Sequence, residues 1–269
     1  GSNVFKAPDV WHSAKLIDAQ DWDTGRKIVT FNPEKRAGVP FRPANGLSST
    51  QLGWFGATAQ AQARLINYLR GDATNESSAS GSFRQRTHKL GDIVNATPIV
   101  VGPPAEKFAE ASNPGYTAFA VAQKNRTPVV YVGANDGMVH AFQADFSTPS
   151  NPLGGGGAEL WAYVPNLVFA GPNNTPKVDG IAALANLNGA TTNGYEHHFY
   201  VDQTPQAADV DFNWTVNTEG TAGTKPSTND WHTVLVGGLG KGGKGFYGLD
   251  ITSVPAAPTT NAVTEGLAE

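Results

Sequence analysis

The residues best suited to chemistry in this sequence are oxygen-bearing side chains spaced as in a calcium-binding loop. They stand at the first, third, fifth and ninth positions of such a loop, as Asp209, Asp211, Asn213 and Asn217. The sixth position needs glycine for a sharp turn but is Trp214, and the twelfth needs glutamate but is Gly220. The pattern therefore favours a polar loop, and we predict no metal ligand here.

A glycine-rich run over 237–245 is the second feature with a chemical interpretation. The spacing of a dinucleotide-binding fingerprint is present at Gly238, Gly240 and Gly243. Gly245 stands where a phosphate-binding loop carries serine or threonine. Both motifs must open into a helix, whose N-terminus holds the phosphate. Because 246–250 has the pattern of a strand, we predict a turn between strands and no bound cofactor.

The histidines show no catalytic or metal-binding pattern. Adjacent His197 and His198 would face opposite sides of a strand, so they cannot easily bind one metal ion. His140 lies within a predicted strand and is interpreted as a hydrogen-bonded residue of the core or of an edge. No Ser/His/Asp arrangement or carboxylate pair follows from spacing, so we predict no catalytic residue.

The tripeptide Arg70-Gly71-Asp72 is the one candidate receptor-binding site, because it has the sequence of an integrin-recognition motif. A role in ending the preceding helix is favoured over receptor binding. Gly71 stands where a glycine ends a helix, and Arg70 would interact favourably with the negative end of the helix dipole.

The composition excludes several classes of protein. The chain has 269 residues with a net charge of −4, so no cationic field indicates nucleic acid as a partner. The absence of cysteine excludes disulfides, zinc-thiolate sites and a cysteine nucleophile. No apolar run approaches the ~20 residues that span a bilayer. Only 16% of residues are charged, and 31 glycines and 18 prolines favour short strands joined by turns.

The first third of the chain predicts one clear helix. Good helix formers fill 58–70, and Ala61, Leu65, Ile66 and Leu69 recur at helical spacing. Before it, 1–57 reads as an irregular segment with short strands, one of them over 26–31. After it, a polar linker completes a region of helix and linker over 58–90.

The remainder, 91–269, contains an internal repeat. Strands are predicted over 92–101, 129–132, 138–142 and 159–164, and again over 199–205, 234–237 and 246–249. Matching landmarks lie 107, 104 and 107 residues apart, as Thr97 and Thr204, Val130 and Val234, Phe142 and Leu249. A four-stranded antiparallel meander is the unit of a β-propeller blade. We therefore predict an all-β fold of about two blades, over 92–165 and 198–253.

Insertions account for the long period of this repeat, because an ordinary blade repeats at ~40–50 residues. They fall at 103–127 and 165–195, each with a short helix, near 116–122 and 181–187. Trp161 and Phe142 are predicted to anchor the core. Applying the 107-residue offset to Trp161 leads to position 268, where the sequence has no tryptophan, so the second unit should lack its fourth strand.

Three segments resemble one family in consecutive order. They are Leu90–Pro98, Tyr131–Phe142 and Val234–Gly245, and 65–72 and 83–86 resemble the stretch that precedes them in the family. The chain thereby resembles the C-terminal propeller of the PilC/PilY family of type IV pilus tip-associated adhesins, within the quinoprotein-like propeller superfamily.

The resemblance implies a non-enzymatic protein exported to the bacterial surface, with a signal peptide outside this sequence. It implies a place at the pilus tip, a role in pilus biogenesis and adhesion, and pilins, other pilus assembly proteins and a host receptor as partners. The family's calcium loop lies further downstream and has no good counterpart here. A closed propeller needs four to eight blades, so the resemblance implies that the full-length protein supplies the missing ones. The 269-residue chain alone is then expected either to associate through its open strand edges or to take the missing blades from another chain.

Two alternatives remain open at this point. A quinoprotein dehydrogenase would hold pyrroloquinoline quinone and calcium at the propeller centre, and many such enzymes carry a Cys-Cys pair that this chain lacks. An envelope scaffold that binds other proteins through its blades is the second alternative.

Overall fold

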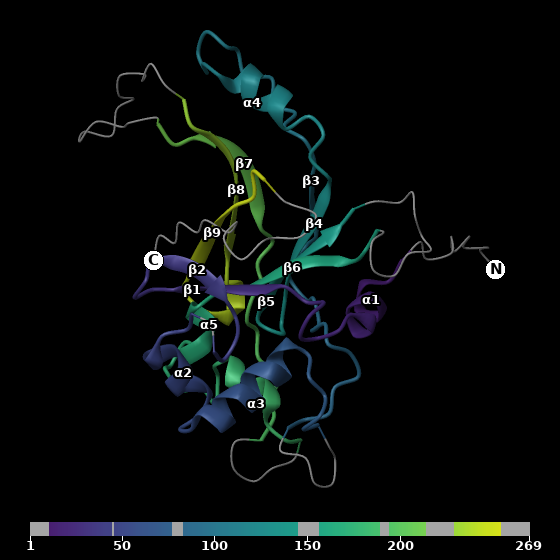
Figure 1. Ribbon diagram of the computed structural model, residues 1–269, viewed down its shortest axis with the longest axis vertical. Coiled ribbons are helices and arrows are strands. Elements are labelled where there is room, and N and C mark those ends of the chain that lie inside the picture. Colours follow the sequence, from purple (N-terminus) through teal and green to yellow (C-terminus); the bar gives the residue numbers. More distant parts are fainter. Residues whose placement is uncertain are drawn as a thin grey trace, which may run out of the picture.

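The structure is a computed structural model built mainly of short strands, with α2, α3 and α5 gathered at one end (Figure 1). It describes residues 11–44, 46–76, 83–144, 156–188, 194–213 and 229–253. Within these ranges the α-helices are α1 (Ser13–Ala19), α2 (Ser49–Phe55), α3 (Ala59–Arg70), α4 (Tyr116–Ala122) and α5 (Leu167–Ala170). Short 3-10 helices are η1 (Ile181–Ala185) and η2 (Gly240–Gly242).

The described strands form a six-stranded and a three-stranded sheet. The first has the order β2-β1-β6-β5-β4-β3, with bounds Ala37–Pro40, Ile28–Asn32, Glu159–Val164, Met138–Gln143, Val129–Ala134 and Ile99–Val101. In it β3 to β6 form the antiparallel meander predicted for the first blade. The hairpin β1–β2 extends this meander, because β1 pairs in parallel with β6.

The first predicted strand is shorter than expected. Only 99–101 of the predicted 92–101 pairs with β4. The backbone N–H groups of Asn95 and Thr97 instead donate to the side chains of Asp202 and Thr204, at 3.1 and 2.8 Å. Side-chain acceptors from the second repeat thus replace a strand neighbour. Each of these pairs joins positions 107 residues apart, so equivalent parts of the two repeats lie in contact.

The second sheet has the order β7-β8-β9, with bounds Gln206–Asp211, Trp231–Gly238 and Phe246–Asp250, and is antiparallel as predicted. The predicted strand over 199–205 is wrong, because β7 begins only at Gln206. This start lies 107 residues after that of β3, so the repeat offset holds. The predicted absence of a fourth strand concerns position 268, which lies outside the described residues.

The N-terminal segment is more regular than predicted. The short strands expected before residue 57 are present, but α1 and α2 show that an irregular segment was the wrong description. A capping box starts α2, because Ser48 and Gln51 each bond the other's backbone N–H. Since β1 and β6 share a sheet, residues on both sides of the predicted boundary at 57 pack as one body.

Helix α3 follows the prediction. Thr58 caps its start by accepting from the Ala61 N–H, and Gly71 ends it with a φ of +124°. Leu65, Ile66 and Leu69 are buried in the core, whereas Ala61 is exposed. Among the described helices, none is both long enough and apolar enough to cross a membrane.

The core is aromatic and joins the two sheets. Trp161 and Phe142 are buried as predicted, and the Trp161 ring lies 5.7 Å from that of Tyr131. Tyr163 of the first sheet and Tyr247 of the second lie 5.7 Å apart, ring centre to ring centre. On the other face of the first sheet, Phe142 packs with Ile17 of α1.

Both predicted insertions contain helices. The first carries α4, which projects from the sheets in Figure 1, and the second carries α5 and η1. Tyr116 of α4 donates to Asp209 of β7 at 2.7 Å and packs its ring 4.9 Å from Trp231 of β8. The first insertion therefore fastens the first repeat onto the second.

We expect Trp161→Ala to lower the free energy of unfolding by about 3–5 kcal/mol, because it removes a buried ring and leaves a cavity. Urea unfolding followed by circular dichroism measures the change. Val121→Ala is the control, since Val121 is 60% exposed on α4, and it should shift stability by less than about 0.5 kcal/mol. Equal midpoints for both variants would refute the placement of Trp161 in the core.

The open edge of the second sheet predicts self-association of the isolated chain. Within the described residues β9 pairs only with β8, and Val236 and Phe246 are about half exposed on one face. Size-exclusion chromatography with light scattering should show a mass that rises with concentration. Phe246→Lys should reduce this rise because it places a charge on the edge strand, whereas Val121→Lys on α4 should not. A wild-type chain that stays monomeric at high concentration would contradict the prediction.

Candidate functional site

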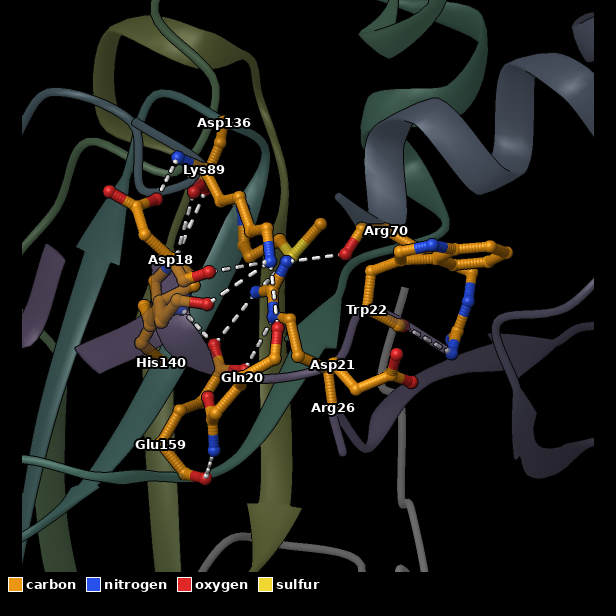
Figure 2. Close-up of polar contacts among 12 residues, drawn as sticks. Asp18, Gln20, Asp21, Trp22, Arg26, Arg70, Lys89, Asp136, His140 and Glu159 are labelled. Atoms are coloured by element: carbon orange, nitrogen blue, oxygen red, sulfur yellow. Dashed lines mark hydrogen bonds and ion pairs between the residues drawn. The ribbon is translucent and has the colours of Figure 1, made fainter. Parts of the chain in front are cut away.

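The arginine of the candidate tripeptide is buried. Arg70 is 1% exposed, and its guanidinium donates to the carbonyl oxygens of Phe41, Trp22 and Asp23 at 3.1 to 3.2 Å. Figure 2 shows this side chain reaching back toward Trp22. Burial and the neighbouring charges of Arg42 and Arg26 lower the pKa of Arg70 to about 10, so it stays charged at neutral pH.

The other two residues of the tripeptide have local structural roles. The Gly71 N–H donates to the Asn67 carbonyl and closes α3, and a Cβ there would meet the Lys89 side chain at 2.9 Å. The Asp72 carboxylate accepts from the Thr74 N–H and hydroxyl at 2.9 and 2.5 Å. Receptor binding by Arg70-Gly71-Asp72 stays a prediction, and it would require Arg70 to leave its three carbonyl partners.

A buried ion pair lies beside Arg70. Arg26 donates through Nε and Nη2 to the two carboxylate oxygens of Glu159, at 2.7 and 2.8 Å. Both side chains are almost fully buried, and Nη1 of Arg26 donates to the Arg70 carbonyl at 2.7 Å. Arg26 therefore connects the N-terminal segment, the outer strand of the first blade and the end of α3 (Figure 2).

His140 extends this pair into a network of four charged side chains. Its Nδ1 lies 2.7 Å from Glu159, and its Nε2 lies 3.1 Å from Asp136. Burial alone would lower the pKa of His140, but the charge of Asp136 and the hydrogen bonds to both carboxylates raise it to about 9. The imidazole is therefore doubly protonated at neutral pH and donates from both nitrogens.

The four charges sum to zero, two positive and two negative. Burial alone would raise the pKa of Glu159, but the charge of Arg26 and the hydrogen bonds from Arg26 and His140 hold it well below its usual range. Burial of a charge costs little only when the charge is paired and hydrogen-bonded in this way. Because both nitrogens of His140 are already donating, the arrangement suits holding segments together.

Sequence reasoning found His140 but missed Arg26 and Glu159. Strand alternation would place Glu159 on the face of Trp161. The pairing of β5 with β6 shifts there, so that Ala141 is opposite Trp161 but Phe142 is opposite Glu159. This shift places the Glu159 carboxylate on the same face of the sheet as His140. No residue pattern in the sequence predicts the shift.

Lys89, just before the first blade, holds the end of α1. Its ammonium donates to three carbonyl oxygens at the C-terminal end of α1. They belong to Ile17, Asp18 and Gln20, at 3.4, 3.1 and 2.7 Å. A cation is favourable there because the carbonyls carry the negative end of the helix dipole. The Gln20 side chain in turn donates to the Glu159 carbonyl at 3.0 Å.

The remaining candidate residues serve the fold. The glycine-rich run joins β8 to β9 through η2, and a strand follows it as predicted. His197 bonds Asp92 at 2.8 Å. The carboxylate of Asp209 accepts from the hydroxyls of Thr233 and Tyr116, and Asn217 lies outside the described residues. In the described part of the chain, no group of three acidic or histidine side chains could hold a metal ion.

These features define the chain as part of a β-propeller. Comparison with known proteins identifies which one, because the family model described as the PilY1 beta-propeller domain matches residues 90–264. The chain therefore belongs to the PilY1 β-propeller family. The first predicted meander and its repeat both fall inside the matched range.

Curated relatives of this chain also carry the name PilY1. A type IV pilus biogenesis factor PilY1 homolog of Xylella fastidiosa is 40% identical over 200 residues, which cover 73% of this chain and 13% of the relative. The type IV pilus biogenesis factor PilY1 of Pseudomonas aeruginosa is 37% identical over 260 residues, or 90% of this chain and 18% of the relative. The chain thus spans less than a fifth of these relatives.

A solved structure is also similar in sequence. The crystal structure of the Pseudomonas aeruginosa PilY1 C-terminal domain shares 30% identity over 62% of this chain and 24% of that chain, with a TM-score of 0.34. The family assignment rests on the sequence matches.

Breaking the buried pair should be costly. We expect Arg26→Met or Glu159→Gln each to lower the free energy of unfolding by about 3–5 kcal/mol, because each leaves its partner uncompensated. The double variant Arg26→Met/Glu159→Gln should lose clearly less than the sum of the losses of the two single variants. Arg42→Gln, which opens a partly exposed pair with Asp23, should cost under about 1 kcal/mol. Strictly additive losses in urea unfolding would show that the pair is not coupled.

The raised pKa of His140 predicts a loss of stability at alkaline pH. The folded value of about 9 exceeds the ordinary value of 6.5, so the contribution is complete below pH 6.5 and is lost as pH rises through 9. Over this window the free energy of unfolding should fall by up to ~1.4 kcal/mol per pH unit. His140→Gln should flatten the slope. Parallel pH profiles for wild type and variant would exclude His140 as the titrating group.

Proposed function

We propose that this chain is part of the propeller of a type IV pilus biogenesis factor. The observation that carries the proposal is the family match over 90–264 together with relatives of that name at 40% and 37% identity. The chain covers a small part of those relatives, so it would act as one structural portion of a much longer protein.

We infer a non-enzymatic role for this portion. The acids and histidine that most resemble catalytic groups are Asp136, His140 and Glu159, and each is bonded to a charged neighbour. The chain would also work without a metal of its own, because the Asp209 carboxylate already accepts from two hydroxyls. Incubation with EDTA should leave its thermal midpoint unchanged, and a fall of several degrees would contradict this.

The test of the proposed function is a pilus count. In a bacterium encoding the full-length protein, deletion of the gene should remove surface pili, and the wild-type gene should restore them. A gene carrying Trp161→Ala should fail to restore them, whereas Val121→Ala should succeed, because only the first residue is buried in the core. Unchanged pilus numbers in the deletion strain would overturn the proposal and favour an envelope scaffold.

We propose a surface location at the pilus tip, with pilins, other pilus assembly proteins and a host receptor as partners. The tripeptide ending at Asp72 is the candidate receptor contact. Asp72→Glu should then lower adhesion to host cells without changing pilus numbers. Asp21→Glu is a matched control, because the Asp21 carboxylate also accepts from the N–H and hydroxyl of a nearby threonine, Thr24. Equal adhesion by both variants would exclude the tripeptide.

A further inference from the structure

A pocket of about 250 Å³ lies at the C-terminal half of α3, with Asp136 of the buried charge network on its wall. Its wall combines a basic segment, Arg84 to Asp92, with Tyr68 and Leu69 of α3 and with Leu184 and Tyr195 of the second insertion. Arg84, Arg86 and Lys89 put a concentration of positive charge here in a chain whose net charge is −4.

Most charges around this pocket are already paired. Arg86 bonds Glu76 at 2.6 Å, His88 bonds Asp18 at 2.6 Å, and the Lys89 ammonium lies on three carbonyls. The two acids of the wall are paired as well, Asp92 with His197 and Asp136 with His140. This leaves Arg84 without an anionic partner among the described residues.

Arg84 is held in place with its terminal nitrogens unused. Its Nε donates to the Leu184 carbonyl at 3.1 Å, and its guanidinium lies 3.9 Å from the ring centre of Tyr195. Within the described residues neither terminal nitrogen has a hydrogen-bond acceptor. The other arginines that are not exposed all place a terminal nitrogen on an oxygen, at Arg26, Arg42, Arg64, Arg70, Arg86 and Arg126.

A fixed guanidinium with two unused nitrogens is suited to a carboxylate, which can accept two parallel hydrogen bonds from it. The volume is smaller than the ~300–1,000 Å³ of sites for whole small molecules, so it fits a side chain better than a free ligand. Leu69 and Leu184 provide apolar wall for the stem of such a side chain.

A second hollow continues beside this pocket. Phe83 and Ala185, the chain neighbours of Arg84 and Leu184, line a cavity of about 560 Å³ together with Phe55 and Leu65. The Arg84 N–H donates to the Ala185 carbonyl at 3.0 Å, which joins the wall of the first hollow to the wall of the second. An acidic side chain in the first hollow could therefore be accompanied by an apolar one in the second.

We propose that this double hollow is a docking site for an acidic peptide segment of a partner protein, with a glutamate carboxylate on Arg84 and an adjacent apolar side chain in the cavity next to Phe83.

Two peptides that differ only in charge test the proposal on the 269-residue chain. They are acetyl-Leu-Glu-Leu-amide and acetyl-Leu-Gln-Leu-amide, titrated while ¹H–¹⁵N spectra are recorded. The glutamate peptide should bind at least about tenfold more tightly, because a charged bidentate hydrogen bond is stronger than a neutral one. It should shift the amides of Arg84 and Tyr195. Equal binding of both peptides by the wild type would overturn the proposal, without need of any variant.

Variants then assign the preference to Arg84. Arg84→Gln should abolish the preference for the glutamate peptide, and Arg84→Lys, which keeps the charge but not the planar fork, should weaken it. Arg36→Gln removes the same charge from an exposed position in the β1–β2 turn and should leave the preference intact. A preference that survives Arg84→Gln, or one lost equally in Arg36→Gln, would contradict the proposal. Displacement of the peptide by inorganic phosphate at equal concentration would also overturn it, because the site would then not select a carboxylate.

Discussion

The buried pair of Arg26 and Glu159 is the constraint on which the rest of this structure depends. Removing two charges from water costs several kcal/mol per ion, and only full pairing offsets the cost. Full pairing here requires β6, the segment before β1 and the Arg70 carbonyl at the end of α3 to meet at one point. The parallel pairing of β1 with β6 brings the same two segments together. The N-terminal segment therefore belongs to the first blade in space.

Other buried or partly buried cations near this pair are also bonded to oxygen atoms. Arg70 and Lys89 both end on backbone carbonyls, and His140 lies between two carboxylates. Each cation thereby ties together segments that are far apart along the chain. Arg84 stands apart because its charge is positioned but not neutralised within the described chain.

Sequence patterns predicted the features that depend on local periodicity. The repeat offset predicted the antiparallel meander of the first sheet and the antiparallel second sheet, and helical spacing predicted α3 with its end at Gly71. Ser48 and Gln51 have the sequence pattern of the capping box that begins α2, so this helix start could have been predicted but was missed. The contact of Arg26 with Glu159 could not be predicted, because it joins residues 133 positions apart and depends on a shift in strand pairing.

Native-state hydrogen exchange tests the central claim, that the charge network makes the N-terminal segment and the first blade one cooperative unit. Amides of β1, such as Val29 and Phe31, should exchange with the same free energy as amides of β6. Glu159→Gln should lower both free energies by the same amount. Exchange of β1 amides orders of magnitude faster than those of β6, with β6 unaffected by Glu159→Gln, would show that the network does not couple the two segments.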